Sequence, residues 1–275
     1  MATQLEKANR FKALHERPGA FVIPNPWDIG SARLLAGLGF EALATTSSGF
    51  AHAAGVEDGE VTLAQVIDHC RELAAATHVP VSADLENCFA DDPQEAAKTI
   101  TLAARAGVVG GSIEDYSPAA KSVYDFSLAV ERVHAAVEAA RALDFPFTLT
   151  ARAENLLRGR NDLDDTIRRL QAFEAAGADV LYAPALKTLD EVRTVTGAVS
   201  KPVNVLGVLV RGVTVAQLAE AGARRISVGG AFAAVLNSAL VRAGTELRDA
   251  GNFGWLTNLT PNNELMRLLR AGADK

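Results

Sequence analysis

The sequence predicts a (β/α)₈ barrel of the TIM type. Eight short apolar segments alternate with segments of helical period along the chain, which is the order expected for a parallel barrel of about 250 residues. Four of these units share one pattern, a helix ending in Ala-Gly or a similar pair followed by an apolar strand: "LLAGLGFEALATT", "LAARAGVVGGSIED", "FEAAGADVLYAP" and "LAEAGARRISVGG". No G-x-G-x-x-G follows the first strand, which argues against a doubly wound sheet.

The other four strands are predicted in "GAFVIPN", "VPVSADLE", "FPFTLTARAE" and "KPVNVL", separated by helical segments such as "TLAQVIDHCRELAAAT" and "DLDDTIRRLQAFEAAG". No linker or low-complexity tract divides the chain, so we expect residues 1–275 to form a single barrel domain. Residues 236–275 are predicted to be a helical extension beyond the eighth unit. This extension either covers the barrel or docks onto a second subunit.

Composition limits the function. The 275 residues are 49% hydrophobic and 22% charged, with a formal net charge of -6, so no basic surface for nucleic acid is expected. The polar start and the lack of a long apolar run predict neither a secretory signal nor a membrane segment. The two cysteines, Cys70 and Cys88, exclude a disulfide framework. We therefore expect a cytoplasmic protein.

Carboxylates cluster where the third and fourth strands end. Asp84 and Glu86 follow the third strand and share one side of the backbone, because strand side chains alternate with period two. Glu114 closes the fourth strand. In barrels the chemistry lies at the C-terminal ends of the strands, and hard oxygen ligands favour Mg²⁺, with Mn²⁺ as an alternative. Any one of these acids could instead be a helix cap.

Other residues at the same end of the barrel suit a small 2-oxo acid. Arg152, which ends the fifth strand, can pair bidentately with a substrate carboxylate, although a rim ion pair is an equal alternative. The backbone amides of Ser47, Ser48 and Gly49 can take another anionic oxygen. Trp27 and Asn204 lie at the ends of the first and seventh strands and are further candidates for substrate contact.

Six stretches, in order, carry a resemblance to a known superfamily: "NPWDIGSARLLAGLGFEAL", "TTSSGF", "GVEDGEVT", "VPVSADLE", "GGSIED" and "TARAEN". Over about residues 10–235 the chain resembles the isocitrate lyase / phosphoenolpyruvate mutase superfamily. The resemblance implies a barrel whose final helix is exchanged between subunits of a homodimer or homotetramer. It also implies Mg²⁺-dependent cleavage or formation of C–C or P–C bonds beside a 2-oxo acid, through an enolate.

The resemblance also assigns roles to single residues. Ser48 and Gly49 match the oxo-acid-binding turn, and Arg152 matches the arginine that binds the substrate carboxylate. The residues that match metal-site carboxylates are Asp58, Asp84, Glu86 and Glu114. Arg152 and Glu114 are accordingly candidate catalytic residues as well.

The chain departs from the family pattern in two places. The usual Asp-Thr-Gly-Tyr-Gly after the first metal aspartate is here Glu86-Asn87-Cys88-Phe89-Ala90. The loop after the fourth strand reads "EDYSPAAKSVYDFS" and lacks the Lys-Lys-Cys-Gly-His motif of the isocitrate and methylisocitrate lyases. Lys121 and Tyr124 are the candidate catalytic residues that remain in this lid. Cys88 is either a buried thiol or a displaced catalytic one.

The function expected from these features is a Mg²⁺-dependent C–C lyase acting on a small 2-oxo or 2-hydroxy mono- or dicarboxylate. The alternatives are a phosphonopyruvate-type mutase or hydrolase, an oxaloacetate decarboxylase or hydrolase, and a non-catalytic protein that binds a 2-oxo acid with a metal. A Schiff-base aldolase is disfavoured because Lys187 lies past the end of its strand. A zinc hydrolase is disfavoured because the histidines fall mostly in helices.

Overall fold

The computed structural model describes residues 2–273, and the ends of the predicted domain, residues 1 and 274–275, lie outside the described part. All eight predicted strands are present in one parallel sheet, in the order β1-β10-β9-β8-β7-β4-β3-β2. The strands are β1 (Phe21–Ile23), β2 (Leu43–Ala44), β3 (Val81–Ala83), β4 (Gly110–Glu114), β7 (Thr148–Arg152), β8 (Val180–Tyr182), β9 (Val203–Leu206) and β10 (Arg225–Ser227). A hydrogen bond of 3.1 Å from the Ala44 amide to the Pro24 carbonyl joins the two outer strands, so the barrel is nearly closed.

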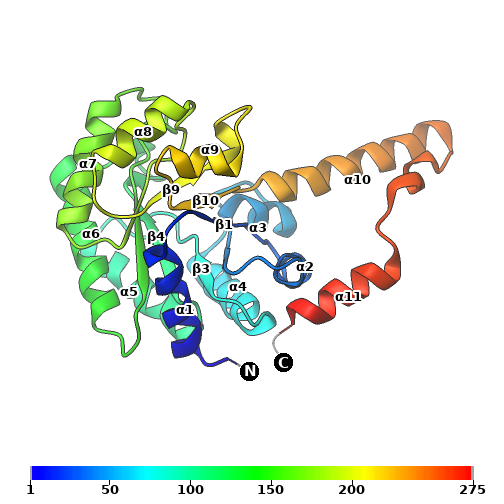
Figure 1. Cartoon of the computed structure of the whole chain (residues 1–275), viewed down its shortest axis with the longest axis horizontal. Coiled ribbons are helices and arrows are strands. Elements are labelled where there is room, and N and C mark those ends of the chain that lie inside the picture. The colour runs from blue at the N-terminus through cyan, green and yellow to red at the C-terminus, as the bar shows by residue number, and fades with distance from the viewer. Residues whose placement is uncertain (1, 274–275) are drawn as a thin grey trace.

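Helices surround the sheet (Figure 1). They are α1 (Gln4–Glu16), α2 (Ile29–Gly37), α3 (Ser47–Ala54), α4 (Leu63–Ala76), α5 (Pro93–Arg105), α6 (Phe126–Arg141), α7 (Leu163–Ala175), α8 (Leu189–Gly197), α9 (Val215–Glu220), α10 (Ala231–Ala250) and α11 (Asn262–Gly272), with the 3₁₀ turns η1 (Gly207–Leu209) and η2 (Gly254–Asn258). Most begin at a polar N-cap, as Asp28, Thr62 and Asp92 do for α2, α4 and α5.

The core lies between the sheet and the inner faces of these helices. Leu73 of α4, Ile100 of α5 and Phe173 of α7 are all fully buried. At the N-terminal end of the barrel, α1 inserts Phe11 against Gly110, where a Cβ would lie 2.8 Å from the phenyl ring. A glycine is therefore needed in β4 to let α1 close this end, and the opposite end is left open for a site.

The segment after β4 forms a short antiparallel hairpin, β5 (Tyr116–Ser117) with β6 (Ser122–Val123). This hairpin is the predicted lid. Lys121 occupies its exposed turn with a positive φ of 51°.

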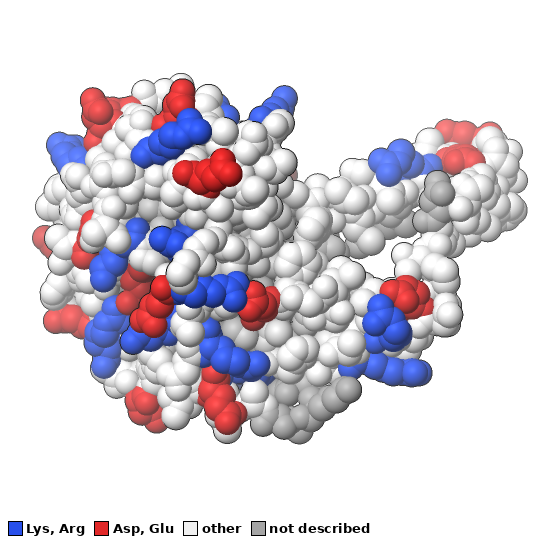
Figure 2. All heavy atoms as spheres, in the orientation of Figure 1, with Lys and Arg blue, Asp and Glu red and all other residues white. Residues whose placement is uncertain are grey.

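Helix α10 projects away from the barrel, and α11 runs back toward α2 (Figure 1). Ala233 is the buried residue of α10, whereas Phe232, Leu236 and Leu240 are 37%, 54% and 71% exposed. Figure 2 shows charges of both signs over the barrel, while the part of α10 beside the barrel shows none on this face. Helix α11 packs on α2 of its own chain, where Gly37 lies directly against the Leu268 carbonyl. Exchange of a helix between subunits stays a prediction.

Among residues 2–273, no helix has the length and apolar character needed to cross a membrane.

Candidate active site

A cavity of about 200 Å³ opens at the C-terminal ends of the strands. Its walls come from most of the barrel, and residues that contribute polar atoms to it include Asn25, Ser48, Asp84, Arg152, Tyr182 and Asn204. Asp84 and Arg152 come from opposite sides of β4 in the sheet order, so the barrel itself brings together residues that are far apart in the sequence. The predicted substrate-binding residues Ser47, Ser48, Asp84, Arg152 and Asn204 all line this cavity.

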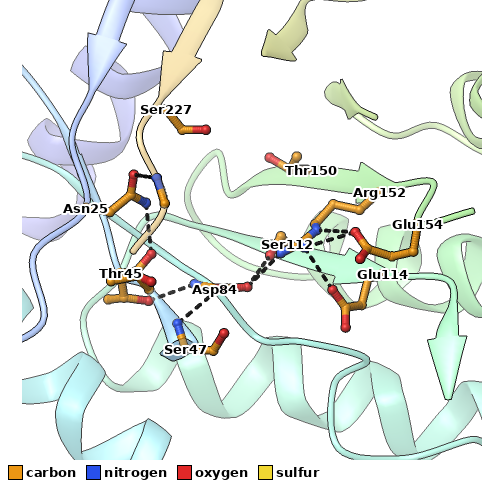
Figure 3. A network of polar contacts seen from close by, with 12 residues as sticks. Asn25, Thr45, Ser47, Asp84, Ser112, Glu114, Thr150, Arg152, Glu154 and Ser227 are labelled. Atoms are coloured by element: carbon orange, nitrogen blue, oxygen red, sulfur yellow. Dashed lines mark hydrogen bonds and ion pairs between the residues drawn. The ribbon is translucent and has the colours of Figure 1, made fainter. Parts of the chain in front are cut away.

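Asp84 is held by bonds to both of its carboxylate oxygens (Figure 3). Oδ1 accepts from Arg152 Nη1 at 3.0 Å and from Ser112 Oγ at 3.3 Å, and Oδ2 accepts from the Ser47 amide at 3.1 Å. The Asp84 amide donates to Thr45 Oγ1 at 2.7 Å. The side chain is therefore fixed in orientation before any ligand arrives.

Arg152 is the centre of an ion-pair cluster. Its guanidinium lies within 3.0 Å of carboxylate oxygens of Asp84, Glu114 and Glu154. Glu114 and Arg152 are neighbours because β4 and β7 pair in that register. Burial alone would lower the pKa of Arg152, but the three carboxylates raise it well above its usual value. The predicted substrate arginine thus already balances charges of the predicted metal ligands.

Negative charge exceeds positive charge in this cluster. Burial, followed by repulsion from Glu154, raises the pKa of Glu114 well above its usual value. Arg158 supplies a second, partly exposed cation, 3.6 Å from oxygens of both glutamates, and stacks 3.7 Å above the Tyr116 ring of the hairpin. Two buried glutamates and the partly buried Asp84, near only two arginines, favour the arrival of a further cation.

Glu86 lies at the start of a strained turn. Glu86, Cys88 and Phe89 have φ values of 50°, 59° and 57°, a region that costs a residue with a side chain on the order of 1 kcal/mol or more. The buried guanidinium of Arg132 holds the turn by donating to the carbonyls of Asn87, Ala90 and Asp91. The departure from the glycine-containing family segment is thus compensated by an arginine from α6.

The Glu86 carboxylate is electrostatically unfavourable where it lies. Its Oε1 is buried and has no hydrogen-bond partner within the described part of the chain. Burial, then Asp84 and Asp58, raise the pKa of Glu86 from 4.5 to about 7. Asp58 itself lies on the exposed loop between α3 and α4. An unpartnered buried oxygen beside two other acids is the kind of donor that a hydrated divalent cation would use.

We expect Glu86→Gln to change how stability depends on pH in the presence of EDTA. The folded carboxyl keeps its proton up to about pH 7, whereas the unfolded one loses it near 4.5, so stability falls as pH rises between these values. Glutamine cannot ionise, and the variant should be more stable than the parent at pH 8, by about 2 kcal/mol. Urea titrations at pH 5 and 8 measure this, with the exposed Glu57→Gln as control. If the free energy of unfolding of Glu86→Gln changed between pH 5 and pH 8 as much as that of the parent, the electrostatic account would be refuted.

The structure does not bring every predicted residue to the cavity. Lys121 lies on the hairpin turn, and the Tyr124 hydroxyl is bonded to Asp91 and to Asn87. Gly49 has too little room for a Cβ because Thr46 and Trp27 pack against it. The catalytic roles of Lys121 and Tyr124 stay predictions, and so do the substrate contacts of Trp27 and Gly49, which do not line the cavity.

The predicted anion-binding turn, residues 47–49, is the first turn of α3. The Ser47 amide donates to Asp84 and the Gly49 amide to Thr46 Oγ1. The Ser48 amide and the helix N-terminus remain for a substrate oxygen.

Cys88 is fully buried, and burial raises the pKa of its thiol to about 12. A neutral buried thiol suits a packing role.

Sequence reasoning missed several cavity residues. Ser112 within β4, Tyr182 at the end of β8 and Arg225 at the start of β10 all line the cavity. The available signal was weak: Arg225 is a charged residue within an apolar strand, two positions before Ser227 at the strand end.

Taken together, these features define a TIM-barrel enzyme site in which acidic residues from adjacent strand ends surround an arginine. The chain belongs to the phosphoenolpyruvate phosphomutase family, whose family model matches residues 11–248, and hence to the isocitrate lyase / phosphoenolpyruvate mutase superfamily.

Individual proteins agree with this assignment. A Burkholderia cenocepacia structure provisionally described as a lyase/mutase is 53% identical, covers 96% of this chain and 95% of its own, and has a TM-score of 0.93. An uncharacterised Mycobacterium tuberculosis protein is 32% identical over 80% of this chain and 81% of its own. The structure of 2,3-dimethylmalate lyase is 27% identical, with coverage of 98% and 95% and a TM-score of 0.84.

The superfamily also includes 2-methylisocitrate lyases and oxaloacetate decarboxylases. The chain is thus an enzyme of lyase or mutase type, and family membership alone does not name its reaction.

Proposed function

We propose that this enzyme is a Mg²⁺-dependent lyase that cleaves a C–C bond in a small 2-oxo or 2-hydroxy carboxylate. The observation that carries the proposal is the excess of buried carboxylate around Arg152 at the mouth of the cavity. Similarity to 2,3-dimethylmalate lyase supports a C–C bond as the one broken. The P–C and decarboxylase alternatives differ from this proposal in the group that leaves.

The donor set fits a hydrated magnesium ion. Asp84, Glu86 and Glu114 provide hard carboxylate oxygens, and the unpartnered Glu86 Oε1 is free to take a ligand or its water. No group of three or more acidic, histidine or cysteine side chains within residues 2–273 forms a ready-made metal cage. Water and substrate oxygens would therefore complete the coordination, as Mg²⁺ commonly requires. Mn²⁺ would suit the same oxygen donors.

Each part of the site would have its own role in the reaction. When bound, Mg²⁺ supplies positive charge that polarises the carbonyl oxygen and stabilises the enolate. Arg152 would pair with the substrate carboxylate once the metal takes over part of its carboxylate partners. The Ser48 amide would donate to another substrate oxygen. The hairpin carrying Tyr116 lies next to Arg158, where it would exclude water from the cavity.

The reaction can be identified directly. Pyruvate, oxaloacetate, 2-oxoglutarate and phosphonopyruvate would be titrated calorimetrically with Mg²⁺ and with EDTA, while products are followed by NMR. We expect metal-dependent binding of 2-oxo acids. Turnover of phosphonopyruvate or decarboxylation of oxaloacetate would replace the C–C lyase proposal with the corresponding alternative. Binding without turnover would indicate that the acid is one product of a larger substrate. Failure of all four to bind would refute the proposal.

We also propose that the enzyme is a homodimer or homotetramer. The exposed apolar side chains Phe232, Leu236, Leu240 and Leu247 follow one face of α10, which is more than an isolated helix would leave in water. The family resemblance supports a second copy of this chain as the partner.

Leu240→Arg should dissociate the oligomer, because the charge would be buried without a partner in the interface. Light scattering coupled to size exclusion measures the mass. Ser238→Arg places the same charge on the opposite face of α10 and should leave the mass unchanged. A monomeric parent protein, or equal masses for the parent and Leu240→Arg, would contradict the assignment.

A further inference from the structure

A row of residues that pair in register on neighbouring strands runs from the carboxylate cluster to the far wall of the cavity. The parallel pairing places Arg152 beside Tyr182, Tyr182 beside Asn204, and Asn204 beside Arg225. All four side chains line the cavity. The row begins at Glu114, which pairs with Arg152, and therefore has an arginine near each end.

The second arginine, Arg225, has only neutral hydrogen-bond partners. Its Nε donates to Asn204 Oδ1 at 2.9 Å, and its Nη2 donates to Thr150 Oγ1 at 2.9 Å. Its Nη1 lies 3.4 Å from His15 Nε2. No carboxylate of residues 2–273 is within ion-pair distance of this guanidinium, and Arg225 is 5% exposed.

His15 accepts from Arg225 without balancing its charge. The His15 Nδ1 lies 2.8 Å from the Phe11 carbonyl and donates to it, which leaves the Nε2 lone pair facing Arg225. Burial, and then the charge of Arg225, lower the pKa of His15 to about 3. Burial lowers the pKa of Arg225 to about 10, so at neutral pH a charged arginine meets a neutral histidine.

The two cavity arginines thus differ in kind. Arg152 is compensated by three carboxylates, whereas Arg225 keeps an uncompensated charge in a buried setting. An unpaired buried charge destabilises the folded protein, and a bound anion would remove this cost. The hydroxyl of Ser227, which accepts from Asn204 Nδ2 at 3.0 Å, lines the cavity beside Arg225 and adds a neutral polar group.

We propose that Arg225, with Asn204 and Ser227, binds a second carboxylate of the substrate, at the end of the molecule opposite the group held near Asp84 and Arg152. The substrate of the lyase is then a dicarboxylate, and Arg225 is the residue that selects it over a monocarboxylate. This inference rests on the proposed function for the identity of the first binding group. The Arg225 subsite itself rests on burial, register and the lack of a counter-charge.

The test uses four acids of equal chain length on the full-length protein with Mg²⁺. Oxaloacetate and 2-oxobutyrate share an oxo group and differ in the second carboxylate, and succinate and butyrate form the same pair without the oxo group. Calorimetry should show each diacid binding at least ~tenfold more tightly than its monoacid.

Arg225→Met should abolish this ratio while leaving 2-oxobutyrate binding unchanged. Arg224→Met removes the neighbouring arginine, which bonds to the Gly19 carbonyl instead, and should keep the ratio.

The outcomes separate this proposal from the proposed function. If Arg225→Met still prefers diacids over monoacids, the Arg225 subsite is overturned. If the parent protein shows no preference for diacids, the subsite is overturned as well, even if 2-oxo acids bind. A third outcome is that the protein prefers succinate over butyrate through Arg225, but binds the 2-oxo acids no more tightly than the acids without an oxo group. This result would support the subsite and overturn the proposed oxo-acid chemistry. If Arg225→Met does not fold, the absence of a diacid preference from the parent protein still overturns the subsite.

Discussion

Arg152→Met should lower the free energy of unfolding at pH 7 by about 3–5 kcal/mol, because the buried Glu114 and Glu154 and the partly buried Asp84 would lose their shared cation. The loss should shrink at lower pH. Without the arginine, the folded-state pKa of Glu114, which burial already raises, rises further, so the folded variant keeps a proton that the unfolded chain releases. Urea titrations at pH 7 and pH 5 measure both effects.

Two further variants separate charge from geometry. Arg168→Met removes an exposed arginine that pairs with Asp165 and should cost less than about 1 kcal/mol. Arg152→Lys keeps the positive charge, so it should retain most of the stability while lowering oxo-acid affinity about tenfold through loss of the bidentate fork. Equal losses in Arg152→Met and Arg168→Met would contradict the cluster's role in stability. Unchanged affinity in Arg152→Lys would place the substrate carboxylate elsewhere.

Asp84→Asn should abolish Mg²⁺-dependent binding of 2-oxo acids, with a loss of at least ~100-fold, while the fold is retained. Asparagine preserves the size of the side chain and one acceptor oxygen, but it removes the charge that would hold the cation. Glu114→Gln should act in the same direction, because Glu114 contributes to the same negative cluster. Calorimetric titrations with Mg²⁺ and with EDTA measure the metal-dependent part of binding.

Asp92→Asn is the matched control. Asp92 caps α5 through the amides of Gln94 and Glu95, and asparagine is an equally good N-cap, so Mg²⁺-dependent binding should be unchanged. Parent-like magnesium titrations in both Asp84→Asn and Glu114→Gln would refute the metal assignment, and circular dichroism establishes that each variant is folded.

The positions of the site residues along the strands were predictable for a physical reason. Strand side chains alternate with period two, and parallel strands in a barrel place their C-terminal ends at one rim. Asp84, Glu114 and Arg152 could therefore be assigned to one end of the barrel from local sequence alone. Their pairing could not be assigned, because it depends on the register of β4 against β7, which places Glu114 opposite Arg152.

The lid was less predictable. Lys121 and Tyr124 are chemically suitable and lie in the expected loop, but hairpin formation places Lys121 at an exposed turn and the buried Tyr124 hydroxyl against Asp91. Side-chain direction in such a loop follows from tertiary packing, including the contact of Arg132 with the Tyr124 ring. No local periodicity encodes those contacts.

The sequence by itself determined the barrel, the strand ends and the acidic character of the site, because hydrophobic period, glycine helix stops and strand alternation are local properties. Only the tertiary structure decided which charges are balanced. Arg152 and Arg225 look alike in the sequence, but β7 brings Arg152 to carboxylates on neighbouring segments while β10 places Arg225 among neutral groups. Charge compensation is a property of residues distant in sequence and adjacent in space, and so it appears only when the barrel has closed.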